Sequence, residues 1–222
     1  MPVSDKVHFS ERRDHELASK NFAEMVALAT SGLVEGLPWS TLSGKTRKAQ
    51  KMAEPLLFDN DEAIVVHLEG LFRPTHLPIY RATARFSQTL DEILSFVWSQ
   101  KYLPWWHPMA HTVQQVEAID DAHQVLLFRW APTSWFGYAW ERDVCALRYR
   151  LPLSADRFPD LGGREAWLVG TMSVLHDDCP PLPASEQVLR AKMQAALLVI
   201  QEESGCEVRF VLQTDLNGSL RG

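Results

Sequence analysis

Few side chains in this sequence have the spacing that a catalytic or metal centre requires. His107 and His111 lie four residues apart, and the run HDDC at 176–179 forms a second polar cluster. A structural zinc takes four ligands, so two histidines are too few, and no spacing fixes partners for the second cluster. We interpret both groups as turn and surface residues, and we expect no metal or other cofactor.

The signals for a nucleophile or a phosphate site are also incomplete. The run SGKT at 43–46 ends like a phosphate-binding loop, but the glycine required five residues before Gly44 is Trp39. Cys145 would need a neighbouring base to act as a nucleophile, and a buried, inert thiol is the commoner case. The motifs G-x-S-x-G, H-E-x-x-H and G-x-G-x-x-G do not occur. The sequence therefore predicts that the chain is not an enzyme.

The composition is that of an ordinary soluble globular protein. The chain has 222 residues, of which 46% are hydrophobic and 23% charged, which suits one domain with a sizeable core and room for a cavity. A net charge of −6 argues against a nucleic-acid partner, which would need a basic patch. Eight Trp and ten Phe suit either a bulky core or the walls of an apolar site.

The cysteines and the N-terminal segment bear on the compartment. Three cysteines at wide spacings argue against a disulfide framework and favour a reducing compartment. The first residues are polar, so we expect no signal peptide, and the longest apolar run, 195–200, is far shorter than the ~18 residues of a membrane helix. We expect a cytoplasmic location.

Two amphipathic helices are predicted. Apolar side chains recur at helical spacing over residues 11–30, and Gly32 and Pro38 follow that segment. A shorter helix is predicted from Thr89 to Trp98, where Thr89 is a suitable N-terminal cap.

Strands account for most of the remaining pattern. In the last one, Val208, Phe210 and Leu212 share one face and only Val211 departs from the alternation. Turn residues separate the later strands at the spacing of an antiparallel meander, so we expect a curved antiparallel sheet that the last strand completes. Strands are predicted over residues 63–71, 79–86, 111–119, 124–130, 143–150, 166–174 and 206–215.

Residues 185–203 fit two patterns. Leu189, Met193 and Ile200 fall on a helical stripe, and the composition favours a helix. Alternate residues of the same segment also fit a strand. Taken alone, the local pattern favours the helix.

The order of these features resembles the START (StAR-related lipid-transfer) domain family over roughly residues 60–220. The run WWHP at 105–108 is similar to the family's Trp-Asp/Asn-Pro start of a strand, and ERDV at 141–144 to its Pro-Arg-Asp-Phe. VLRA at 188–191 is similar to the family's aromatic-Val-Arg-Ala, and VLQTDLNG at 211–218 to its closing Gln-x-Asp-x-x-Gly. Each motif alone is weak, and the ordered set carries the resemblance.

The resemblance implies a helix-grip fold of the α+β class. In this fold a long, bent antiparallel sheet closes over a C-terminal helix, with an apolar lipid tunnel between them. Residues 187–201 would then be a strand, and we follow the resemblance there. We expect the family's C-terminal helix to be missing, unless residues 11–30 take over part of its role. We divide the chain into an N-terminal helix and loop, residues 1–60, and a START-like lipid-binding domain, residues 61–222.

The resemblance also implies a site with one polar end and apolar walls. Arg142 is the first candidate for the polar group, with Glu117 or Asp143 as its acidic partner, and Arg190 is the second; each arginine could instead form a structural salt bridge. A slip of one residue along a strand would turn every wall candidate to the other face. The wall candidates are Val113, Leu126, Phe128, Val144, Ala146, Met172, Val174, Phe210 and Leu212.

These inferences together predict a lipid-binding protein that is not an enzyme. It would hold one sterol, phospholipid or similar apolar molecule and transfer it between membranes, in transient peripheral contact with their surfaces. One alternative is an interaction or regulatory module that keeps the fold without a lipid, with a protein partner covering the exposed face of the sheet. A weaker alternative is a cyclase-like or hydrolase-like enzyme on the same scaffold, because fold does not fix function.

Overall fold

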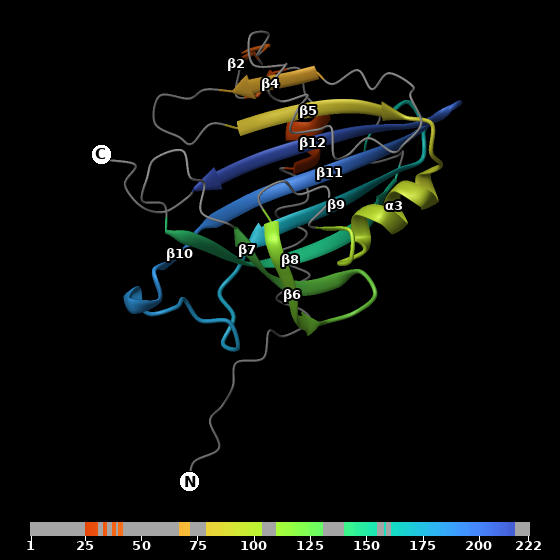
Figure 1. Ribbon diagram of the computed structural model, residues 1–222. Helices are drawn as coiled ribbons and strands as arrows, with labels where there is room; N and C mark the ends of the chain where they lie inside the picture. Colours follow the sequence, from red (N-terminus) through yellow and green to blue (C-terminus); the bar gives the residue numbers. More distant parts are fainter. Residues whose placement is uncertain are drawn as a thin grey trace.

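One large, bent antiparallel sheet organises the protein (Figure 1). The structure is a computed structural model, and it describes residues 25–30, 33–34, 37–38, 40–41, 67–71, 79–103, 110–130, 140–154, 158 and 161–215. In the order in which they neighbour one another, the strands are β3 (Ser40–Thr41), β4 (His67–Leu71), β5 (Ile79–Phe86), β12 (Gly205–Asp215), β11 (Lys192–Glu202), β9 (Ala166–Ser173), β8 (Glu141–Leu153), β7 (His123–Trp130) and β6 (Ala110–Ala118).

Smaller elements complete the described structure. Strand β10 (Val188–Arg190) pairs in parallel with the beginning of β8. A separate hairpin joins β1 (Leu33–Val34) to β2 (Leu37–Pro38). A 3-10 turn, η4 (Ala184–Glu186), comes just before β10.

Helix α3 (Leu90–Trp98) lies across one end of the sheet (Figure 1). Its N-terminus is closed by a capping box: the Thr89 hydroxyl accepts from the Glu92 amide, and the Glu92 carboxylate accepts from the Thr89 amide at 2.9 Å. Leu90, Ile93 and Val97 are buried against the sheet. The cap and the apolar stripe are the features from which the sequence predicts this helix, and both are present.

The strands predicted from alternation are confirmed, with ends that differ by one to three residues for most of them. The strand predicted over 63–71 is described only from His67, and the helix predicted over 11–30 only from residue 25. The runs at 43–46 and 105–108 lie outside the described residues. The fold class expected from the resemblance, a bent antiparallel sheet with few helices, is confirmed.

The local prediction of a helix over 185–203 is wrong. This segment forms β10 and β11, and β11 is hydrogen-bonded to β9 on one side and to β12 on the other. Two neighbouring strands and burial of both faces from Ala195 to Ile200 outweigh the helix propensity of the composition. The resemblance to the START family gives the correct structure here.

The two faces of the sheet have different environments, and we name them by those environments. The pocket face carries Phe128, Thr171, Ala195 and Phe210, and α3 lies on one end of it. The closed face carries Cys145, Tyr149, Leu168, Leu198 and Val211, which pack with the helical segment 25–30. Val211 leaves the alternating pattern of the last strand because the closed face is also apolar at that point.

Packing on the closed face is tight. The ring of Tyr149 lies across Gly170, so that a Cβ atom at Gly170 would stand 2.1 Å from the Tyr149 Cζ. The helical segment 25–30 is held at its C-terminal end by Arg81, which donates to the Leu28 carbonyl at 3.4 Å, and by Arg209, which donates to the Ala29 carbonyl at 3.3 Å. Cations at this end favour the helix because its carbonyls carry partial negative charge. The described part of residues 11–30 therefore covers the closed face, not the pocket face.

Candidate functional site

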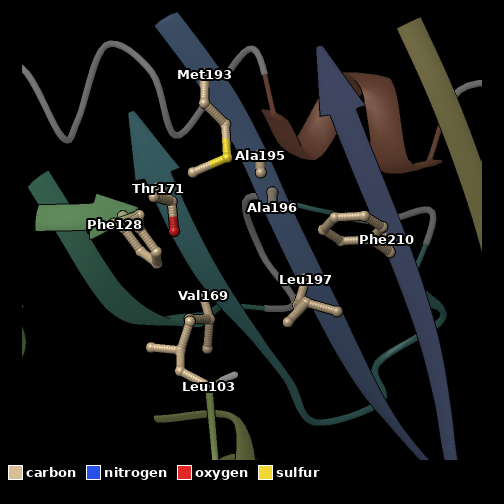
Figure 2. Close-up of a pocket in the computed structure, with 9 residues that line it drawn as sticks. All are labelled: Leu103, Phe128, Val169, Thr171, Met193, Ala195, Ala196, Leu197 and Phe210. Carbon is tan, nitrogen blue, oxygen red and sulfur yellow. The ribbon is translucent and has the colours of Figure 1, made fainter. Parts of the chain in front are cut away.

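An apolar pocket lies on the pocket face beside the turn that follows α3 (Figure 2). It is lined from β7, β9, β11 and β12, and Leu103 closes it from the end of the α3 segment. Figure 2 shows the labelled residues around the pocket, with Thr171 supplying the one polar side chain among them. Ala196 borders the pocket from the strand, but its side chain belongs to the closed face, because it alternates with Ala195 and Leu197. The lining residues are Leu103, Phe128, Val169, Thr171, Met193, Ala195, Ala196, Leu197 and Phe210.

The pocket is small in this conformation. It leaves about 10 Å³ for the centre of a water molecule, which is roughly the room that one water needs. A lipid would therefore have to displace Leu103, Met193 or neighbouring side chains. The side chains of Leu103 and Met193 are packed in an apolar cluster, so displacing them breaks packing contacts.

A polar row crosses the sheet next to the pocket. Gln124 on β7 is the register partner of Arg148 on β8, and Arg148 is the register partner of Thr171 on β9. Register partners in an antiparallel pair place their side chains on the same face. The row continues on the same face with Ala195 of β11, which lines the pocket. The polar side chains thus lead directly to the apolar wall.

Arg148 is a fully buried cation, with 0% of its surface exposed. Its guanidinium donates to the carbonyl of Trp98 at 3.0 Å and to the carbonyl of Val97, at the C-terminal end of α3. It also stacks over the Trp98 ring, with 5.0 Å from the guanidinium carbon to the ring centroid. Burial, together with the nearby charge of Arg150, lowers the pKa of Arg148 to about 9. A negative or strongly accepting group beside Arg148 would be stabilised.

Gln124 brings an unused hydrogen-bond donor to this row. Its carbonyl oxygen accepts from the Gln100 side chain at 2.9 Å, and Gln100 also contacts Gln115. Its amide nitrogen is buried and has no hydrogen-bond partner among the described residues. A buried donor that lacks an acceptor costs free energy, and a ligand oxygen would remove that cost.

Arg142, the first sequence candidate, lies on the pocket face like Arg148, but at the beginning of strand β8. It is half-buried and donates to the carbonyl of Trp140, next to solvent. Six residues of strand separate it from Arg148, which corresponds to about 20 Å. The acids expected as its partners are engaged elsewhere: Asp143 with Arg190, and Glu117 with His176 at 2.8 Å.

Arg190, the second candidate, forms a structural ion pair on the other side of β8. Its Nε and Nη2 atoms donate to the two carboxylate oxygens of Asp143 at 2.8 and 3.0 Å, and its Nη1 donates to the Cys179 carbonyl at 3.0 Å. Asp143 follows Arg142 in the strand, so its side chain points to the opposite face. This geometry places Arg190 with the closed face and away from the pocket, which corrects its assignment to the tunnel.

The apolar wall candidates divide between the two faces. Seven of them gather in one cluster on the pocket face: Val113, Leu126, Phe128, Val144, Ala146, Phe210 and Leu212. Met172 and Val174 pack instead against the cluster of the closed face, which is a correction. On β9, Val169 and Thr171 face the pocket. The prediction of Met172 was therefore displaced by one residue, which places its side chain on the opposite face.

The sequence reasoning missed Arg148, Gln124 and Thr171. One signal could have found Arg148: alternation along β8 places residues 142, 144, 146 and 148 on one face. Arg148 lies in the middle of this strand and Arg142 at its beginning, and a charged residue in the middle of an apolar strand is expected to be the more deeply buried of the two. Gln124 and Thr171 carry no such signal, because only the pairing of β7, β8 and β9 brings them into one row.

The remaining sequence candidates form no further site in the described structure. No three His, Cys, Asp or Glu side chains of the described ranges are grouped so that they could hold a metal ion. His176, from the predicted polar cluster, contacts Glu117, and His107 lies outside the described residues. No helix in the described part of the chain is long and apolar enough to span a bilayer.

Comparison with known proteins connects this geometry to a family. The family model for the START domain matches residues 29–221. No curated protein matches the sequence significantly.

Solved structures of lipid-transfer proteins share the fold. Human StAR-related lipid transfer protein 5 is similar with a TM-score of 0.69 and 14% identity, over 95% of this chain and 86% of that one. Human STARD10 has a TM-score of 0.57 and 16% identity, over 98% of this chain and 73% of that one. A StAR-related lipid transfer protein fragment from Xanthomonas axonopodis has a TM-score of 0.58 and 15% identity, over 82% of this chain and 84% of that one.

Proposed function

Since the chain belongs to the START domain family, we propose that it binds a single lipid on the pocket face and transfers it between membranes. START domains in general bind lipids and do not catalyse reactions, and the similar solved structures are named as lipid-transfer proteins. The observation that carries the proposal is the pocket itself. Eight of its nine lining residues are apolar, and it adjoins the row Gln124–Arg148–Thr171.

The apolar body of the lipid would lie between the end of α3 and strands β9, β11 and β12. Each methylene group moved from water to such a wall contributes roughly 0.8 kcal/mol. A chain of ten methylenes would thus contribute about 8 kcal/mol, which has to exceed the cost of displacing the side chains that now fill the pocket. Leu103 and Met193 are the side chains that we expect to move, because both are apolar and close the pocket.

The polar end of the lipid would meet Gln124 and Arg148. Gln124 offers a buried amide donor, and Arg148 offers positive charge that burial makes costly. A hydroxyl, carbonyl, carboxylate or phosphate oxygen would serve both. Arg142 lies at the outer end of the same face, where we propose that it contacts a head group or the membrane surface during transfer. We place this activity in the cytoplasm, at membrane surfaces.

The experiment is native mass spectrometry of the protein purified from a eukaryotic host, followed by identification of the lipid. We expect one lipid per chain on the wild-type protein and a loss of most of it in Gln124→Leu. Gln114→Leu is the matched control, because Gln114 is exposed on the neighbouring strand β6. A second pair, Arg142→Leu and the exposed Arg129→Leu, tests the outer end in the same way. Circular dichroism verifies that each variant is folded.

The small volume of the pocket favours one other function. A START fold whose pocket stays filled would act as an interaction or regulatory module without a lipid. The same experiment distinguishes the two, because a well-folded wild-type chain that carries no lipid, and extracts none from vesicles, would exclude the carrier and leave the module.

A further inference from the structure

Two cysteines meet beneath the loop that connects β9 to β10. Cys145 lies in the middle of β8 on the closed face, with 0% of its surface exposed, and Cys179 lies in the loop, with 5% exposed. Both belong to one buried cluster of the closed face. Arg190 contacts the Cys179 sulfur and also the carboxylate of Asp143, which lies two residues before Cys145 on the same face of β8. The loop is brought there by the Val174 amide, which donates to the Cys145 carbonyl at 3.0 Å. Both cysteines are reduced in the structure.

A fixed cation stands beside the Cys179 sulfur. The Arg190 Nη2 atom is 3.7 Å from the Cys179 Sγ, and Nη1 donates to the carbonyl of the same residue at 3.0 Å. The bidentate pair with Asp143 prevents the guanidinium from turning away. A positive charge held at this distance favours a thiolate, which is the reactive form of cysteine.

The surroundings give the two sulfurs different roles. The neighbouring Cys145 thiol, reinforced by the charge of Arg190, lowers the pKa of Cys179, although burial and the carboxylate of Asp143 act in the opposite direction. The neighbouring Cys179, together with burial, raises the pKa of Cys145. Of the two, the loop cysteine therefore loses its proton more readily and the strand cysteine keeps its proton more readily.

We propose that Cys179 and Cys145 form an oxidant-sensitive thiol pair, in which Cys179 reacts with a peroxide and Cys145 then closes an intramolecular disulfide. This inference goes beyond the lipid function and does not depend on it, because both sulfurs lie away from the pocket face. The residues on either side of Cys179, from Asp177 to Pro181, are exposed. A molecule as small as hydrogen peroxide therefore approaches through the surface of the loop.

The reaction has two steps. The Cys179 thiolate attacks one peroxide oxygen, an S–O bond forms as the O–O bond breaks, and the hydroxide that leaves takes up a proton as water. The Cys145 thiol then loses its proton, its sulfur attacks the Cys179 sulfur, and the S–S bond forms as the S–O bond breaks, releasing a second water. Overall the two thiols lose two electrons and two protons, and one peroxide is reduced to two waters.

The chain contains its own control in Cys206. This cysteine lies on the pocket face among the residues packed against α3. Burial, with the nearby carboxylates of Glu202 and Glu92, raises its pKa to about 11. Cys206 should therefore stay reduced under conditions that oxidise the pair.

The test treats the full, folded chain with hydrogen peroxide, blocks the remaining thiols with an alkylating agent and maps the peptides by mass spectrometry. We expect a peptide in which Cys145 is linked to Cys179, with Cys206 alkylated. Before oxidation, we expect iodoacetamide at pH 7 to modify Cys179 roughly tenfold or more faster than Cys206, since the thiolate is the nucleophile. Cys206→Ser should behave as the wild-type protein does.

Variants separate the roles of the two sulfurs and of the arginine. Cys145→Ser should accumulate a sulfenic acid at Cys179, trapped by dimedone, without a crosslink. Arg190→Gln should shift the pH at which Cys179 becomes reactive upward, and Arg190→Lys should restore part of the shift. The proposal is overturned if the folded wild-type chain forms no Cys145–Cys179 crosslink, or if Cys206 is oxidised as fast as Cys179. The wild-type and Cys145→Ser results decide the matter even if the Arg190 variants do not fold.

Discussion

The closed face and the pocket face of the sheet are built from the same strands but are filled differently. On the closed face, Tyr149 covers Gly170 and the helical segment 25–30 packs on Leu168, Leu198 and their neighbours. On the pocket face, α3 covers one end, and beside it lie a small apolar pocket and a buried polar row. Alternate residues of one strand thus serve different purposes, stability on one side and, in our proposal, ligand binding on the other.

The difference shows where the fold can tolerate change. Side chains on the closed face pack against core residues that have no room to move. In an interior of this packing density, adding or removing a single methyl group changes stability. Side chains at the pocket meet others that have to move if a lipid is to enter. Substitutions at neighbouring positions in one strand should therefore have separable effects on stability and on binding.

The largest expected effect is that of Gly170→Ala on the closed face. The new Cβ would stand 2.1 Å from the Tyr149 ring, and we expect a loss of about 3 kcal/mol in the free energy of unfolding. Denaturant titration measures this loss, and Tyr149→Leu in the same chain should recover part of it because the clash disappears. If Gly170→Ala costs no more than Thr171→Ala on the pocket face, the closed face is not as tightly filled as we describe.

A matched pair on β11 tests the separation of the two faces most sharply. Ala196→Leu adds volume to the closed core and should lower the free energy of unfolding by roughly 1–3 kcal/mol. Ala195→Leu adds the same atoms at the pocket, so it should cost less stability but reduce the lipid bound per chain severalfold. Thermal unfolding and native mass spectrometry give the two readouts. If Ala196→Leu and Ala195→Leu had the same effect on stability and the same effect on the lipid bound, the two faces would not have separate roles.

Acid should weaken the closed face first, through Glu207. Burial alone would raise the pKa of this carboxyl, but hydrogen bonds and charge from Arg209 and Arg85 outweigh burial and lower the pKa below 4.5. A lowered pKa in the folded state means that the stabilisation is complete at neutral pH and is lost as the pH falls below about 4.5. Glu207→Gln should therefore lower stability at pH 7 by on the order of 1 kcal/mol.

The pH dependence distinguishes this cause from a general packing defect. Below the pKa the wild-type carboxyl is also neutral, so Glu207→Gln and the wild-type protein should converge in stability as the pH falls. Stability measured by urea titration between neutral and acidic pH checks the convergence. A constant difference across that range would assign the loss to packing.

The smallest expected effect is at the cap of α3. Thr89→Ala removes the hydroxyl that accepts from the Glu92 amide, which should cost roughly 0.5–1 kcal/mol. Since α3 covers one end of the pocket face, the same change should also speed lipid release slightly. Release is measured by the rate at which a fluorescent lipid moves from the protein to vesicles. Thr89→Ser, which keeps the hydroxyl, is the control.

Much of the fold could be predicted from the sequence because period-2 alternation is a direct consequence of strand geometry. The strand over 79–86 is predicted with its exact ends, and the short helix after Thr89 follows from its cap. The segment 185–203 could not be resolved locally. Its residues favour a helix in isolation, and only the neighbours β9 and β12 make it a strand. The resemblance supplied that non-local information.

The candidate site was less predictable, because the sequence of one strand does not determine how deeply a side chain is buried or how the strand pairs with its neighbours. Arg142 and Arg148 have the same orientation along β8, but one lies at the solvent end and the other is fully buried. Met172 and Thr171 are neighbours in β9, and the choice between them depends on how β9 is paired with β8 and β11. Seven wall candidates on β6, β7, β8 and β12 lie on the pocket face, whereas their contact with a lipid stays a prediction.

The central claim, that the lipid lies on the pocket face, is tested most directly by photo-crosslinking. The wild-type chain would be incubated with vesicles that contain diazirine derivatives of cholesterol and of phosphatidylcholine, irradiated and mapped by mass spectrometry. We predict adducts on pocket residues, first Met193, Phe210 and Leu103. Adducts on Met172, Val174 or Leu198 of the closed face, or no adduct on a folded chain, would contradict the account.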